Sequence, residues 1–299
     1  SLTINSGGTF LAPSGTTTIT SMTSTGSGDR SLNNKSGGTF TNNDGTVLFN
    51  GSSDQRIEMA GTGNVHNVTL NKSDNDFVWM SNSTFEGDFD ITLETTHVAR
   101  PTGTANTLTV TGDVIVREGI LLRSQNDCTG AMSFGSLTIE SGGTYAATSG
   151  TTTITSEDSG GNAIDIDGTF THNKGTVKID HDTTTNLDIL GTSGTDLYNL
   201  IVDSDGTVNY NTTTIENNLT KLGSGLMRPT GDTGRNLTIK GTLLLQAGSF
   251  GRGANDTNTN TFGNIVVEGG TLILTGGGGS GKTIVNGSFR NVGGTVTSH

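Results

Sequence analysis

The sequence predicts an all-β fold, a parallel β-helix (β-solenoid), from three observations. The segment Ser1–Phe10 returns almost unchanged as Ser136–Tyr145, and self-similarity at a fixed spacing is the signature of a solenoid or array. Only 29% of the 299 residues are hydrophobic, which is too few for a compact globule but enough for turns that bury a narrow inner stripe. Short β-branched segments alternate with Gly, Asn and Asp turns, and no helical periodicity is sustained.

The repeat extends through most of the chain. Four further segments return at offsets of 130, 132, 128 and 128 residues; they begin at Phe40 and Phe170, Asn67 and Asn199, Arg100 and Arg228, and Phe134 and Phe262. We therefore expect one continuous β-solenoid over residues 1–299, built from tandem repeats of about 130 residues: 1–135, 136–263 and a partial third at 264–299. Because the chain begins at a repeat boundary, ends inside a repeat and lacks an initiator Met, we expect a processed protein or a segment of a longer one.

The expected strands follow one another at short, regular intervals. They include residues 2–4, 16–20, 46–49, 67–70, 107–111, 113–117, 137–139 and 237–239. Gly7-Gly8, Asp44-Gly45 and Asn50-Gly51 are examples of the turns between them, because Gly, Asn and Asp tolerate positive φ. A duplicated closed barrel would need a linker, and none is evident, so the spacing favours a continuous solenoid. The residues expected to point into its core are Phe40, Val47, Leu70, Phe170, Val177 and Ile201.

Composition excludes several classes of function. The net charge is −12 with a pI near 4.6, which opposes binding to nucleic-acid phosphates. The single Cys128 excludes an intramolecular disulfide and a Cys-rich zinc site. No run approaches 18 apolar residues, so we expect no membrane insertion.

Carboxylates are the first candidates for chemistry. Enzymes with a β-helix fold place carboxylates on one face of the stack, and glycoside hydrolysis needs two of them about 5–9.5 Å apart. The candidates are Glu86, Asp88 and Asp90, then Asp165 and Asp167, then Asp180 and Asp182 with Lys174 and Lys178 near them. In so Asp-rich a chain we favour solvated turn residues, and we expect no catalytic residue.

Metal and cofactor signals are weak. Asp74 and Asp76, and separately Asp165 and Asp167, offer the oxygen ligands that calcium prefers, but neither pair completes a known calcium-binding loop. We therefore expect no metal or other cofactor, with these four residues as the calcium candidates. The histidines His66, His172 and His181 do not cluster by pattern.

Two other patterns are better explained by structure than by ligand binding. The segment Gly276–Thr283 resembles the end of a phosphate-binding loop, but a strand-like segment follows where a helix is needed, so we reject nucleotide binding. Some polar residues recur between repeats and indicate structural corner bonds; they are Glu86 and Glu216, Arg100 and Arg228, and Asn126-Asp127 and Asn255-Asp256.

The phrase from Gly38 to Gly51, GTFTNNDGTVLFNG, followed by Val65–Asn71, resembles the β-strand repeat proteins of bacterial surfaces and of marine bacteriophage particles. Tyr198–Val202 repeats part of the same wording. The resemblance implies an extracellular or virion-associated β-helix used as a stalk, fibre or adhesin. Its motifs are those of turns and strands, so it implies no functional residues.

We therefore expect a non-enzymatic structural or adhesive module of an extracellular filament, a cell surface or a phage particle. The expected partner is the chain itself, stacked head to tail or within a larger repeat chain, with a glycan or another cell-surface ligand as a further candidate. The alternative is a polysaccharide lyase or hydrolase of the β-helix type. Ice binding is less favoured, because the triplets Thr16–Thr18 and Thr151–Thr153 lie too far apart to form a ladder on successive turns.

Overall fold

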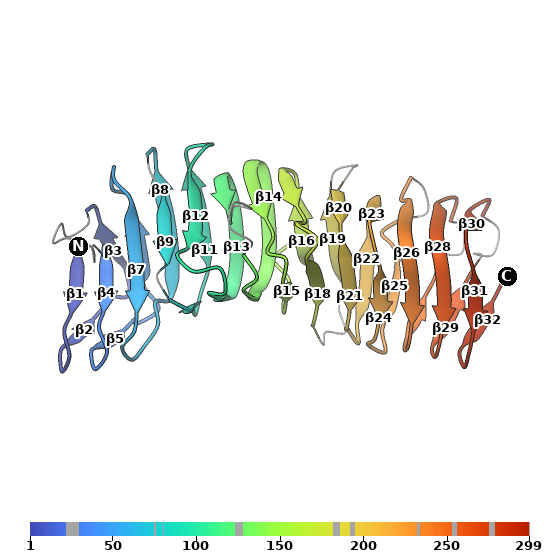
Figure 1. Cartoon of the computed structure of the whole chain (residues 1–299), viewed down its shortest axis with the longest axis horizontal. Coiled ribbons are helices and arrows are strands. Elements are labelled where there is room, and N and C mark those ends of the chain that lie inside the picture. Colours follow the sequence, from blue (N-terminus) through green and yellow to red (C-terminus); the bar gives the residue numbers. More distant parts are fainter. Residues whose placement is uncertain are drawn as a thin grey trace. The chain divides into compact units, whose positions relative to one another are not determined.

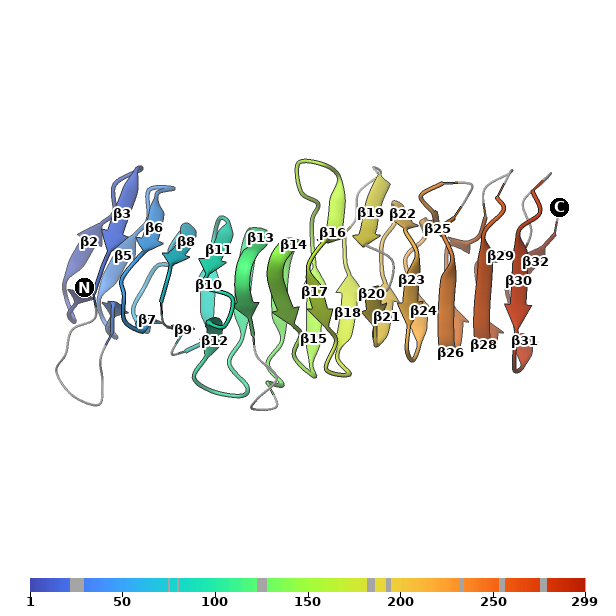
Figure 2. The ribbon, with the colours of Figure 1, turned by 90° about the horizontal axis from the view of Figure 1, so that it is seen from above.

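In the computed structural model the chain is a parallel β-solenoid of about 10 turns, with about 23 residues per turn. The structure describes residues 1–21, 30–74, 76–79, 81–122, 128–181, 186–191, 195–231, 234–252, 256–274 and 279–298, and no helix occurs among them. The chain forms two compact units: unit 1 is Ser1–Thr151 with Gly168–Asn173, and unit 2 is Thr152–Asp167 with Lys174–His299. Within each unit the strands follow one another in chain order (Figures 1 and 2).

The strands of unit 1 are β1 Leu2–Ile4, β2 Thr9–Leu11, β3 Thr16–Ile19, β4 Leu32–Asn34, β5 Thr39–Thr41, β6 Thr46–Phe49, β7 Gln55–Met59, β8 Asn67–Lys72, β9 Phe77–Trp79, β10 Ser83–Phe85, β11 Phe89–Leu93, β12 Val98–Pro101, β13 Leu108–Leu121, β14 Met132–Ala146 and β17 Thr169–Thr171. Strand β15 Thr151–Ile154 begins at Thr151, the last residue of the first segment of unit 1, and its other residues belong to unit 2.

The strands of unit 2 are β16 Asn162–Ile166, β18 Thr176–Ile179, β19 Asn186–Gly191, β20 Thr195–Leu197, β21 Asn199–Val202, β22 Thr207–Tyr210, β23 Thr213–Ile215, β24 Leu219–Lys221, β25 Leu226–Pro229, β26 Leu237–Leu245, β27 Ser249–Phe250, β28 Thr259–Val267, β29 Thr271–Ile273, β30 Lys282–Val285, β31 Phe289–Asn291 and β32 Thr295–Thr297.

Each turn of unit 1 contributes to three parallel ladders. Strand β13 pairs in succession with β10, β11 and β12. The first ladder continues from β10 through β13 into β14. The second runs through β3, β6, β8, β11, β13 and β14, and the third through β1, β4, β7, β9, β12, β13, β14 and β17. In-register parallel pairing stacks like positions of successive turns, so inward side chains bury one another.

Unit 2 is built in the same way. One ladder runs through β18, β21, β24, β26, β28 and β31. A second runs through β20, β23, β26, β28 and β30, and a third through β16, β19, β22, β25, β27, β29 and β32.

The structural repeat is the turn of about 23 residues, and the expected structural repeat of about 130 residues is wrong. A shift of 130 residues is about 5⅔ turns, since 130 divided by 23 is about 5.7, so corresponding segments reach different ladders. Leu2 pairs with Leu32 in the third ladder, whereas its counterpart Leu137 pairs with Val114 in the second. The sequence copies therefore share a strand-and-corner pattern that more than one ladder can use. The expected boundaries at 135 and 263 stay a prediction.

The core consists of the inward residues of the ladders. Phe40, Val47, Leu70 and Val177 are buried, as predicted. Phe170 stands in register with the buried Tyr145, 5.6 Å from it between ring centroids, but remains half-buried.

The inward prediction for Ile201 is wrong. Leu200 and Val202 are buried on either side of it, and Ile201 is half-exposed. Side chains alternate along a strand, so an error of one residue moves a side chain to the other face.

Asn and Asp side chains at the corners join one turn to the next. Asn67 Oδ1 accepts a hydrogen bond from Asp88 N at 2.8 Å, and Asp88 Oδ1 accepts one from Asp113 N at 2.9 Å. In unit 2, Asn218 Oδ1 accepts one from Thr242 N at 2.9 Å. Backbone N–H groups at these corners thus gain partners from side chains of the preceding turn.

Candidate functional site

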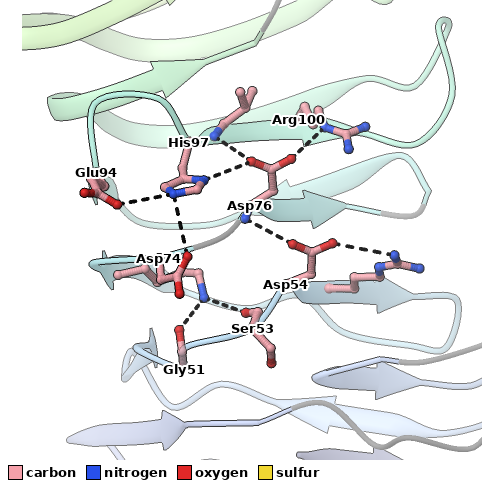
Figure 3. A network of polar contacts seen from close by, with 11 residues as sticks. Gly51, Ser53, Asp54, Asp74, Asp76, Glu94, His97 and Arg100 are labelled. Carbon is pink, nitrogen blue, oxygen red and sulfur yellow. Dashed lines mark hydrogen bonds and ion pairs between the residues drawn. The ribbon is translucent and has the colours of Figure 1, made fainter.

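The richest polar cluster of the predicted candidates lies at three stacked corners of unit 1 (Figure 3). Each corner connects the second ladder to the third. The first corner contains Asp54 before β7, the second contains Asp74 and Asp76 between β8 and β9, and the third contains Glu94 and His97 between β11 and β12. Parallel stacking brings these three segments together because each comes one turn after the last.

Asp54 and Asp76 bind the backbone of the following turn. Asp54 Oδ1 accepts a hydrogen bond from Asp76 N at 3.2 Å, and Asp76 Oδ1 accepts one from Val98 N at 3.0 Å. Their outer oxygens face arginines, with Arg100 Nε 3.3 Å from Asp76 Oδ2 and Arg56 Nη2 3.9 Å from Asp54 Oδ2. Both carboxylates are therefore engaged in the stack (Figure 3).

His97 is surrounded by carboxylates. Its Nε2 lies 3.4 Å from Glu94 Oε2 and 3.8 Å from Asp74 Oδ1, and its Nδ1 lies 3.8 Å from Asp76 Oδ1. These separations are longer than the separation of about 2.9–3.0 Å typical of an N–H···O hydrogen bond. The imidazole therefore lacks the close, directed contacts of a metal-ligand set.

Lys72 lies in the core next to the cluster, and no pattern of candidate residues in the sequence singled it out. Its side chain is buried, and Nζ donates to Gly51 O at 2.5 Å, to Ser53 O at 2.9 Å and to Gln55 Oε1 at 3.1 Å. Burial lowers the pKa of Lys72 to about 8, against the opposing effect of the neighbouring aspartates. The signal was present in the alternation along β8, where Val68, Leu70 and Lys72 share the inward face.

Unit 2 has a second lysine of this kind. Lys221 is fully buried, and its Nζ donates to Ser204 O at 3.4 Å and to Gly223 O. Burial lowers its pKa to about 8, opposed by Asp203 and Asp205. Both lysines donate hydrogen bonds to backbone carbonyl groups at the corners, which is a structural use of a buried cation.

A cleft of about 320 Å³ opens beside the cluster. It is lined by Asn71, Lys72, Ser73, Thr92, Leu93, Glu94 and Glu118. Carboxylates, hydroxyls and an amide can contact a hydroxylated ligand here, while the Lys72 ammonium is turned inward to the three acceptors given above.

The structure separates the calcium candidates. Asp74 and Asp76 share the His97 cluster of unit 1, whereas Asp165 and Asp167 belong to unit 2. The pKa of Asp165 is raised, chiefly by burial and then by Asp167 and Asp158. Across the described ranges, no group of three or more His, Cys, Asp or Glu side chains is arranged to hold a metal ion. Calcium binding stays an untested prediction.

The candidate carboxylates of unit 1 are bonded within the stack. Asn42 Nδ2 donates to Glu86 Oε2 at 2.7 Å, and Asn64 Nδ2 donates to Glu86 Oε1 at 3.0 Å. Arg117 Nε donates to both oxygens of Asp90 at 2.9 and 3.1 Å, and Arg117 also pairs with Glu140.

The candidate carboxylates of unit 2 that the structure describes are also paired with side chains of the stack. Lys178 Nζ lies 2.7 Å from Asp180 Oδ2 and 3.1 Å from Asp203 Oδ2. Lys240 Nζ lies 2.6 Å from Glu216 Oε1. Asp182, like Asn126, Asp127 and Asn255, lies outside the described residues.

The phosphate-loop-like segment runs into a strand, and the first Thr triplet lies on another. In the segment that resembles a phosphate-binding loop, Lys282–Val285 is strand β30, as expected, and residues 275–278 lie outside the described ranges. On the turn after Thr16–Thr18, the register partners are Thr46, Val47 and Leu48, so the first Thr triplet does not recur there.

The comparisons with known proteins add no relative: no family model, no curated protein and no solved structure matches the chain. Within the described residues, no helix has the length and apolar character needed to cross a membrane.

Proposed function

We propose that the protein is a non-enzymatic structural or adhesive module of an extracellular filament, a cell surface or a virion. The observation that carries this proposal is the use of its corner carboxylates, which include Asp54 beside several of the predicted candidates. Asp54, Asp76 and Asp88 accept backbone N–H groups of the next turn, and Glu86 and Asp90 bind side chains of neighbouring turns. Groups held in this way stabilise a stack and are poorly placed to act on a substrate.

The proposed partner is a further solenoid turn, either of a longer repeat chain or of a second copy. Strands β30, β31 and β32 pair with β28 and β29, and no pairing beyond them occurs among the described residues. Phe289 stands in register with the fully buried Ile265 yet is 44% exposed. An open strand edge next to uncovered core residues favours pairing with another strand.

Sedimentation over a range of protein concentrations tests this partner. We expect the 299-residue chain to associate as its concentration rises and Phe289→Lys to weaken that association. Ile201→Lys is the matched control, because Ile201 also lies on a strand of unit 2 but faces outward within the stack. A folded wild-type chain that stays monomeric at high concentration would exclude end-to-end association.

The alternative function is a polysaccharide lyase or hydrolase, and the cleft with Glu94 and Glu118 is the observation that favours it. Two carboxylates beside a hollow are the minimum for glycoside hydrolysis. Incubation with acidic and neutral glycans tests it: product formation lost in both Glu94→Gln and Glu118→Gln would replace the structural proposal with this one. The same assay on Asp180→Ala tests the carboxylate of unit 2 that the sequence singled out.

A further inference from the structure

We propose that Lys72 and Gln55 react to form an isopeptide bond, joining Nζ of the lysine to Cδ of the glutamine and tying two successive turns of unit 1 together. This inference is independent of the proposed function. It concerns a covalent modification within the stack.

The two side chains are held against each other in the core. Lys72 is 3% exposed and Gln55 is fully buried, and Lys72 Nζ lies 3.1 Å from Gln55 Oε1. The carboxamide is also oriented from its other sides: Gly51 N donates to Oε1 at 2.9 Å, and Nε2 donates to Ile19 O at 2.7 Å. Holding the amine and the carboxamide next to each other lowers the entropy cost of bringing them together for reaction.

The surroundings also direct the nucleophile. An amine attacks only when it has lost its extra proton, and burial brings the pKa of Lys72 down to about 8. Gly51 O and Ser53 O each accept a hydrogen bond from Nζ. When the third proton leaves, those two acceptors retain the remaining N–H groups, so the lone pair is left on the side of Gln55.

The reaction balances without a further reagent. The Nζ lone pair adds to Gln55 Cδ, and the electrons of the C=O double bond move to Oε1, where Gly51 N–H is placed to stabilise the negative charge. One proton passes from Nζ to Nε2, the electron pair on Oε1 re-forms the Cδ=Oε1 double bond, and the Cδ–Nε2 bond breaks so that ammonia leaves. The product is a secondary amide, with no change of oxidation state.

Lys221 provides a control within the same chain. It is equally buried and its pKa is lowered to the same value, but in the described part of the chain its Nζ contacts the backbone carbonyls of Ser204 and Gly223 and no carboxamide. Burial and a lowered pKa alone therefore predict no reaction at Lys221.

Mass spectrometry of the full chain tests the proposal. After incubation near pH 9, about one unit above the pKa of Lys72, we expect the intact mass to fall by one ammonia per chain. After proteolysis, tandem spectra should show a branched peptide joined at Gln55 and Lys72. Lys72→Met and Gln55→Leu should keep the full mass, and Lys221→Met should lose ammonia as the wild type does.

The wild-type branched peptide decides the question even if a variant fails to fold, which circular dichroism would show. A wild-type chain that keeps its full mass after prolonged incubation would overturn the proposal. So would an ammonia loss mapped to Asn50 or Asn286, because an Asn followed by Gly can lose ammonia by closing a cyclic imide on its own backbone.

Discussion

Replacing Lys221 by Met should remove one of two similar contributions to the rise of stability with pH on the alkaline side, because the pKa values of Lys72 and Lys221 are both lowered to about 8. The Lys221 side chain is fully buried, and its pKa falls from 10.5 to about 8 on folding. Between these values the unfolded chain binds more protons than the folded chain, so the free energy of unfolding rises with pH. The burial penalty of this lysine is thus fully present below pH 8 and relieved by pH 10.5.

The size of the effect follows from the two pKa values. One pH unit of full proton difference corresponds to about 1.4 kcal/mol, and the difference is only partial at each end of the window. Integration from pH 8 to pH 10 gives a rise of about 2 kcal/mol in the free energy of unfolding. Burial also raises the pKa of Tyr210 and lowers the pKa of Lys72, but their contributions are the same in both proteins and cancel in the comparison.

Urea unfolding followed by circular dichroism at pH 8, 9 and 10 measures this difference. We expect the wild type to gain about 2 kcal/mol relative to Lys221→Met across the window. Lys240→Met is the matched control in the same unit, because the hydrogen bond to Glu216 raises the pKa of the exposed Lys240 and its titration lies above the window. A Lys221→Met chain with the full wild-type rise would refute the assignment of a buried, readily deprotonated lysine.

Two further predictions concern the corners. Asp76→Ala removes the acceptor of Val98 N–H and the partner of Arg100, so it should lower the free energy of unfolding by about 1–3 kcal/mol in urea titrations. Asp76→Asn keeps an oxygen for Val98 N–H and should lower the free energy of unfolding by less. Equal losses in the two variants would contradict this role of Asp76. Gly225→Ala would place a Cβ 1.7 Å from Gly206 O in the preceding turn, while a Cβ on Gly231 meets nothing within 4 Å. Thermal melts should show a clear drop in melting temperature for Gly225→Ala and little change for Gly231→Ala. An unchanged melting temperature for Gly225→Ala would show that the turns can separate there.

The fold could be predicted because parallel stacking leaves a strong trace in the sequence. Strand-forming triplets and Gly, Asn or Asp corners identify the solenoid, and Phe40, Val47 and Leu70 were placed correctly in its core. The turn length could not be found from the long repeat, because a shift of about 5⅔ turns preserves the pattern of strand and corner while changing the ladder. Ile201 failed for a smaller reason: Leu200, Ile201 and Val202 are all apolar, so the alternation that separates the two faces is invisible there.

The candidate site was less predictable than the fold. The sequence singled out Asp74 and Asp76, but the partners that decide their role, His97, Arg100 and the Val98 amide, come from the next turn. Such contacts depend on the register between turns, which varies from 18 residues between Thr195 and Thr213 to 30 residues between Leu2 and Leu32. A fixed spacing therefore could not identify the neighbours of a corner residue.

Corner carboxylates hold one turn of the stack to the next. Hydrogen exchange at the Asp76 amide, measured in the wild type and in Asp54→Ala, tests it most directly, because Asp54 Oδ1 is the acceptor of that N–H at 3.2 Å. We predict slow exchange in the wild type and markedly faster exchange at Asp76 in the variant, while the ladder amides of β9 stay protected. Equally fast exchange at Asp76 in both proteins would contradict the claim.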